Sequence, residues 1–157
     1  MKNYISNLNG LHIKYIIINL IITIAVYLSS LVIGDIGLEY KINMYISIVM
    51  MILILIFFIS GRKKYQTQLN KIKLFNVGKK LNEYHTINKN RLNSFTIMTF
   101  IASIGFISSS NILYLVFCIL SILLIFLNRS SKIKLSFELN LSKEELDMID
   151  KPAKDIK

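Results

Sequence analysis

The sequence predicts an all-α integral membrane protein with four transmembrane helices arranged as two hairpins. The chain of 157 residues is 54% hydrophobic, above the share of about 45–50% that is usual for soluble domains. Its apolar residues gather in four blocks, at residues 15–33, 44–60, 93–110 and 112–128. A strongly basic segment, residues 61–92, separates the first two blocks from the last two.

The basic segment sets the expected orientation of the four blocks. Nine lysine or arginine residues and one glutamate give residues 61–92 a net charge of +8, out of +10 for the whole chain. Loops rich in lysine and arginine remain on the cytoplasmic side of a membrane. We therefore expect a multi-pass protein of the cell membrane, a bacterial inner membrane, with this loop and both termini in the cytoplasm. Because the charge lies beside apolar blocks, it favours anionic lipid headgroups as partners and not nucleic acid.

The first block, residues 15–33, contains nineteen residues without a charge. As a helix it spans about 28 Å, close to the hydrocarbon thickness of about 30 Å. A cleaved signal peptide with Lys2 and Lys14 as its basic start is the alternative, but the apolar part of a signal peptide is usually about 7–15 residues long. We predict a membrane-spanning helix.

Four polar residues within this first block repeat at spacings of 4, 4 and 3, which places them on one helical face within about 80°. This polar stripe consists of Asn19, Thr23, Tyr27 and Ser30. Its side chains can hydrogen-bond between helices, at about 0.6 kcal/mol per contact, or they can line a pore or substrate path in an oligomer. We expect the packing role, because none of the four blocks contains an Asp, Glu, Lys, Arg or His that a proton relay or ion-coupled transporter would use.

The second block, residues 44–60, follows a connector at residues 34–43 whose net charge is −1, which predicts a non-cytoplasmic position for that connector. A cluster of cations follows the block and is expected to anchor its cytoplasmic end. The residues expected to contact lipid headgroups there are Arg62, Lys63, Lys64, Lys71 and Lys73.

Apolar residues within the basic loop recur at helical spacing on both sides of residues 76–78. We predict two short amphipathic helices joined near Gly78. They either lie on the inner leaflet or pack as an antiparallel cytoplasmic hairpin that continues the second and third membrane helices. A solvated basic linker is a third alternative.

The third and fourth blocks are separated by a turn-like sequence at residues 108–111. A single helix over residues 95–127 would be about 50 Å long, which exceeds the bilayer core, so the two blocks are predicted to form a tight hairpin. Ala102 and Gly105 are small residues of the kind found where membrane helices approach closely. Residues 1–128 would then form the transmembrane domain.

The tail, residues 129–157, is expected to be cytoplasmic and begins with an alternation of apolar and polar side chains that predicts one strand. Its apolar face would be Ile133, Leu135, Phe137, Leu139 and Leu141. The strand would pair with a second copy, pair with another protein, or rest on the inner leaflet. Ser142 and Glu145 are spaced as a capping box for a short helix, which would end before Pro152.

Motifs that carry catalysis are not found in this sequence. It contains no glycine-rich phosphate loop, no paired cysteine or histidine spacing and no nucleophile elbow. Cys118 is the only cysteine, and His12 and His85 lie far apart. We therefore expect no cofactor, no metal and no enzyme activity. The expected function is binding to a partner, as a subunit, assembly factor or immunity-type protein, in a homo-oligomer or with another membrane protein. The alternative is an oligomeric small channel or transporter lined by the polar stripe.

The charge pattern makes a testable prediction about topology. Reporters fused after Lys71 and after Lys157 should read cytoplasmic, and a reporter fused after Glu39 should read outside, because only the first two sites follow basic segments. Paired phosphatase and fluorescent-protein fusions measure this. A tail that reads outside while the loop reads inside would mean that the third and fourth blocks form one span.

Overall fold

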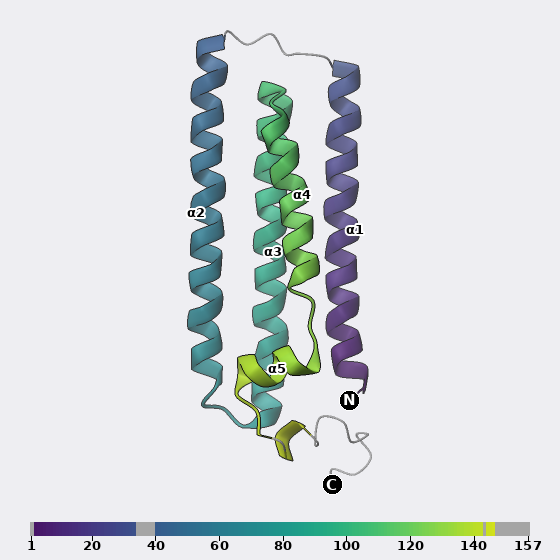
Figure 1. Cartoon of the computed structure of the whole chain (residues 1–157), viewed down its shortest axis with the longest axis vertical. Coiled ribbons are helices and arrows are strands. Elements are labelled where there is room, and N and C mark those ends of the chain that lie inside the picture. Colours follow the sequence, from purple (N-terminus) through teal and green to yellow (C-terminus); the bar gives the residue numbers. More distant parts are fainter. Residues whose placement is uncertain (1, 34–39, 143, 147–157) are drawn as a thin grey trace.

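A computed structural model describes residues 2–33, 40–142 and 144–146, and nearly all of them are helical (Figure 1). The described elements are α1 (Lys2–Ile33), α2 (Tyr40–Ile72), α3 (Val77–Ser109), α4 (Ile112–Leu127) and α5 (Lys132–Leu139). Residues 34–39 of the connector predicted at 34–43, and the predicted helix end near Pro152, lie outside the described residues. The rest of that connector belongs to α2, which begins at Tyr40.

Three helices, α1, α2 and α3, are each long and apolar enough to cross a membrane, and α4 with α5 forms a pair bent by 87° that would supply a fourth span. The prediction of an all-helical chain with several helices suited to a membrane is therefore confirmed. On the outer surfaces of α1, α2 and α4, large apolar side chains such as Leu31, Ile59 and Leu127 are exposed. A soluble domain would bury such continuous apolar surface, whereas lipid does not oppose its exposure.

The bundle is built around α3. α1, α2 and α4 all pack along α3, and α1 also packs on α4. α1 and α2 stand on opposite sides of the α3–α4 pair, and α5 lies across one end of the bundle (Figure 1). The second predicted hairpin is therefore a packed pair, whereas the two helices of the first flank it.

Buried side chains form two clusters, one in each half of the bundle. The first, which we call the membrane cluster, contains side chains from all four helices α1, α2, α3 and α4 and centres on Leu92, Ala102 and Tyr114. A loop-side cluster joins the start of α1, the end of α2, the start of α3 and α5, around Leu8 and Leu139. The start of α1 is part of this cluster because Leu8 is fully buried, although the sequence predicted no structure there.

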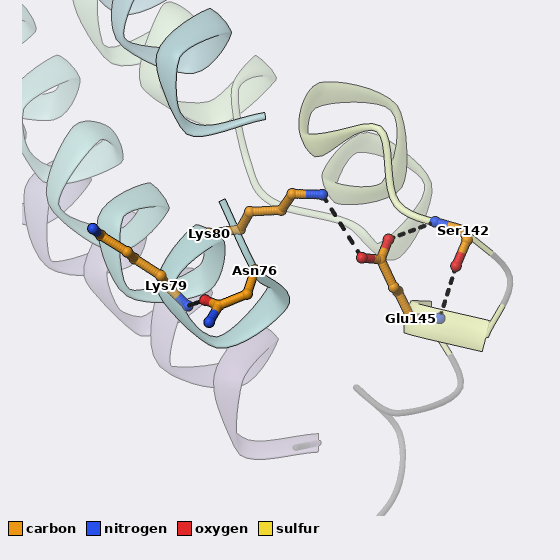
Figure 2. Close-up of polar contacts among 5 residues, drawn as sticks. All are labelled: Asn76, Lys79, Lys80, Ser142 and Glu145. Atoms are coloured by element: carbon orange, nitrogen blue, oxygen red, sulfur yellow. Dashed lines mark hydrogen bonds and ion pairs between the residues drawn. The ribbon is translucent and has the colours of Figure 1, made fainter. Parts of the chain in front are cut away.

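The basic loop forms the antiparallel hairpin, which was one of the two predicted helical arrangements. α2 continues past its apolar block to Ile72, and α3 begins at Val77, so the hairpin extends both membrane helices. The turn lies a few residues before the predicted joint at Gly78. Asn76 fixes it, because its side-chain oxygen accepts the Lys79 N–H at 3.1 Å (Figure 2), which satisfies one of the free N–H groups at a helix start.

The predicted strand of the tail is wrong, because residues 132–139 form helix α5. On a helix, residues two apart point in directions about 200° apart, and residues four apart differ by only about 40°. The five alternating apolar residues therefore lie on different faces of the helix, and some are buried while others are exposed. Leu135 and Leu139 are buried in the loop-side cluster, whereas Ile133 and Phe137 are 84% and 85% exposed. A helix also satisfies its own backbone groups, which a single strand cannot do.

The capping box after α5 is confirmed. The Ser142 N–H donates to Glu145 Oε2 at 2.8 Å, and the Glu145 N–H donates to Ser142 Oγ at 3.1 Å. The other carboxylate oxygen of Glu145 lies 3.7 Å from Lys80 Nζ (Figure 2). This ion pair connects the tail to the first turn of α3.

After the turn between α3 and α4, a side chain of α4 packs directly against α3 at Gly105. Ser110 ends α3 with φ 51°, and Asn111 caps α4 by accepting the Leu113 N–H at 3.0 Å. The fully buried ring of Tyr114 then packs over Gly105, and its hydroxyl donates to the Ser47 carbonyl of α2 at 2.9 Å. A Cβ at Gly105 would lie 2.5 Å from this ring, so only glycine fits here.

Gly105→Ala should therefore destabilise the bundle by about 1–3 kcal/mol, because the Tyr114 ring would have to move and strain its hydrogen bond. Cys118 is free and fully buried, so a thiol-reactive dye reports thermal unfolding in detergent. Gly10→Ala is the matched control, since nothing lies within 4 Å of its Cβ position and alanine gains the same helix propensity. Equal unfolding midpoints for the two variants would contradict the close α3–α4 contact.

Candidate functional site

The polar stripe of α1 does not form one continuous polar surface. Asn19 is fully buried, and its Nδ2 donates to Thr96 Oγ1 of α3 at 3.0 Å and to the Tyr15 carbonyl at 2.7 Å. Thr23 Oγ1 donates to the Asn19 carbonyl at 2.8 Å. Tyr27 is 48% exposed, and Ser30 Oγ donates to its carbonyl. Within the stripe, Asn19 therefore bonds to α3, whereas the hydroxyls of Thr23 and Ser30 bond to carbonyls of their own helix.

The five cations expected to contact lipid headgroups all lie on α2 or in the turn after it, and all are exposed. They are Arg62, Lys63, Lys64, Lys71 and Lys73. Only Arg62 and Lys73 also line the cavity described below. The structure thus separates two cations that share a cavity from three that face outward.

A carboxylate that the sequence analysis did not single out lies at the centre of a polar cluster where α5 meets α2 and α3. Glu138 Oε2 accepts the Tyr84 hydroxyl at 2.6 Å and the Tyr65 hydroxyl at 2.9 Å. Both phenols are buried. Hydrogen bonds to an ionised acceptor are about twice as strong as neutral ones, so this pair of bonds holds α5 across the hairpin.

Arg91 occupies the next position in the cluster. Its guanidinium lies 4.1 Å from the centre of the Tyr65 ring and 5.9 Å from that of Phe95, a cation–π arrangement. Its Nη2 donates to Asn128 Oδ1, between α4 and α5. Its Nη1 is buried and has no hydrogen-bond partner within the described residues.

Two further basic side chains, Lys134 and His12, lie beside Asn128. Lys134 Nζ donates to the Asn128 carbonyl at 2.8 Å. Burial lowers the pKa of Lys134, Glu138 acts in the opposite sense, and Arg91 lowers it further. His12 of α1 is fully buried, and its Nδ1 donates to the Leu8 carbonyl at 2.8 Å. Two cations, Arg91 and Lys134, therefore lie near one carboxylate, Glu138.

A cavity of about 540 Å³ opens between α2, α3, α4 and α5, and we call it the interfacial cavity. Its volume lies within the range of about 300–1,000 Å³ that is typical of small-molecule sites. One end is apolar and the other polar. The apolar end is lined by Phe57, Phe58, Met98 and Leu124, and Phe137 of α5 lines the cavity next to Glu138. The charged side chains at the polar end are Arg62, Lys73, Arg91 and Glu138.

The interfacial cavity is suited to an anionic group attached to an apolar one. Three cations and one carboxylate line it, and the carboxylate is already hydrogen-bonded to Tyr65 and Tyr84. Among the described residues, no group of three His, Cys, Asp or Glu side chains is placed to hold a metal ion.

In comparisons with known proteins, no family, no curated protein and no solved structure matched this chain. Its function is therefore inferred from its own residues. The sequence analysis missed Arg91 and Glu138 as a pair because their positions in the chain differ by 47. A local signal did exist for Arg91, which is the last charged residue before the third apolar block, whereas Glu138 lies inside the alternating segment of the tail.

Glu138→Gln should lower stability by about 1.5–3 kcal/mol, because the amide offers a weaker, uncharged acceptor to the two phenols. Thermal unfolding followed by Cys118 labelling measures this. Glu144→Gln, at an exposed site, removes the same charge from the tail and should have little effect. Equal unfolding temperatures for the two variants would show that Glu138 does not hold α5 in place.

Proposed function

We propose that this protein is a four-span component of the bacterial inner membrane, with both termini in the cytoplasm, that acts by binding another membrane protein and not by catalysis. The observation that carries this proposal is the uneven burial of the spanning helices. The most apolar stretches of α1 and α2 are 11% and 6% buried within the chain, against 44% for α3. Each flanking helix therefore keeps most of its circumference free for lipid or for a partner helix.

Helix association in a membrane depends on close van der Waals packing and interhelical hydrogen bonds. α3 and α4 use these contacts within the chain, at Gly105 and Tyr114. α2 contacts α3 but leaves side chains such as Val49, Leu55 and Ile59 exposed along its length. This surface is long enough to accommodate another spanning helix, which supports a role as a subunit, assembly factor or immunity-type protein.

The competing function, a channel or transporter lined by the polar stripe, has less support. Asn19 faces α3 and bonds to Thr96 there, and Thr23 bonds to its own helix. A permeation path needs polar groups that face an open space, whereas Asn19 is fully buried against α3, and its Oδ1 has no hydrogen-bond partner in the described part of the chain. The stripe therefore favours helix packing.

Site-specific photo-cross-linking tests the partner-binding proposal. A photoreactive phenylalanine at Leu55, which is 54% exposed on α2, should give one discrete product with another membrane protein in intact cells. The same group at Phe58, which packs against the membrane cluster, should react within the chain and serves as the control. Mass spectrometry after purification in mild detergent identifies the product. Cross-links to lipid alone at Leu55 and at Ile59 would refute partner binding through α2.

Asn19→Leu separates packing from permeation. Replacing the amide removes its bond to Thr96 and should change stability in detergent by roughly 1 kcal/mol, with no change in ion flux through reconstituted liposomes. Thr96 itself still donates to the Leu92 carbonyl, so no buried hydroxyl is left without a partner. A large change in flux with unchanged stability would support the channel instead.

A further inference from the structure

We propose that the interfacial cavity binds one anionic phospholipid of the inner leaflet, with its phosphate at the polar end and the upper part of an acyl chain at the apolar end. The assignment to the inner leaflet rests on the proposed orientation. The binding itself does not depend on whether the protein also has a partner. It is a specific site, distinct from general attraction of lipid to the exposed lysines.

The polar end of the cavity has the positive charge that a phosphate needs. Arg62, Lys73 and Arg91 line it. Arg91 Nη1 is buried without a hydrogen-bond partner in the described part of the chain, and a buried donor of this kind is costly unless a ligand satisfies it. A guanidinium binds phosphate through two parallel hydrogen bonds. Stacking on Tyr65 holds the Arg91 fork in place before any ligand binds.

The single carboxylate of the cavity does not oppose this assignment. Glu138 Oε2 accepts both the Tyr65 and the Tyr84 hydroxyls. The three cations that line the cavity outnumber this one carboxylate. The cavity therefore retains a net positive charge, which matches an anion.

The apolar end favours a lipid over a soluble anion. Phe57 and Phe58 belong to the uncharged block of α2, whereas Arg62 follows the block directly. Five residues, or about 7.5 Å of helix, separate Phe57 from Arg62. The cavity therefore crosses from the apolar to the basic part of α2 over the distance at which a phospholipid changes from acyl chain to phosphate. Inorganic phosphate would use only the polar end.

Single-tryptophan fluorescence can test this site, because the chain contains no tryptophan. Phe57→Trp places one reporter in the cavity wall. In nanodiscs with the same small mole fraction of brominated lipid, brominated phosphatidylglycerol should quench it more than brominated phosphatidylcholine. The expected preference is about tenfold in apparent affinity, equivalent to about 1.4 kcal/mol for charge-assisted phosphate contacts. Equal quenching by the two lipids would overturn the proposal.

Neighbouring cations provide a matched pair of variants in the Phe57→Trp background. Arg62→Gln removes a cavity cation and should abolish most of the preference, whereas Lys63→Gln removes the same charge one residue away, outside the cavity. Arg91→Gln should act like Arg62→Gln. Equal losses for Arg62→Gln and Lys63→Gln would mean diffuse attraction to a basic surface and would refute a specific site.

Two further measurements make the result decisive. Excess inorganic phosphate at constant ionic strength should leave the preference unchanged, and its loss would show that the site binds a soluble anion and not a lipid. Phe137→Trp, at a rim position that is 85% exposed, provides a second reporter in case the larger ring at position 57 fills the cavity. It should show the same lipid preference. Since the purified chain is tested alone, a missing cross-linking partner would not affect this outcome.

Discussion

Packing against α3 is the interaction on which the rest of the structure depends. α3 runs without a break from Val77 to Ser109 and contributes to both buried clusters. α1, α2 and α4 pack along it, and α5 is bonded to it through Tyr84 and Glu138. Because lipid offers no hydrophobic force to drive helices together, these contacts must come from shape and hydrogen bonds. Gly105, which admits the Tyr114 ring, and Thr96, which accepts from Asn19, supply both.

The loop-side half of the bundle differs from the membrane half because charged side chains are packed within it, so their loss of hydration must be compensated. Taking a carboxylate out of water is costly unless hydrogen bonds replace the lost hydration. Glu138 accepts hydrogen bonds from two phenols, which replace its lost hydration. Arg91 is also partly removed from water, and aromatic faces and Asn128 replace part of its hydration. Arg91, whose Nη1 has no partner among the described residues, lines the interfacial cavity. The three cations and one carboxylate that line this cavity are the basis of the proposed anion site.

Several local features could be predicted because neighbouring residues decide them. The apolar blocks predicted the membrane helices, and the spacing of Ser142 and Glu145 predicted the capping box that the structure contains. The strand predicted for the tail failed for an equally physical reason. Alternation of apolar residues over nine positions fits a strand, but Leu135 and Leu139 also lie four apart and form one apolar helical face. Contact with the hairpin decided between the two, and no local pattern contains that contact.

The sequence by itself determined the number of apolar blocks, the position of the basic loop and the helical caps, because hydrophobicity and capping act over a few residues. Only the tertiary structure decided that α1 and α2 stand on opposite sides of α3 and α4. It also decided that Arg91, Glu138 and Phe57 line one cavity. These residues come from three helices, and their meeting depends on how the helices are rotated and aligned against one another. Side-chain shapes across several interfaces together set that alignment, and no single stretch of sequence contains them.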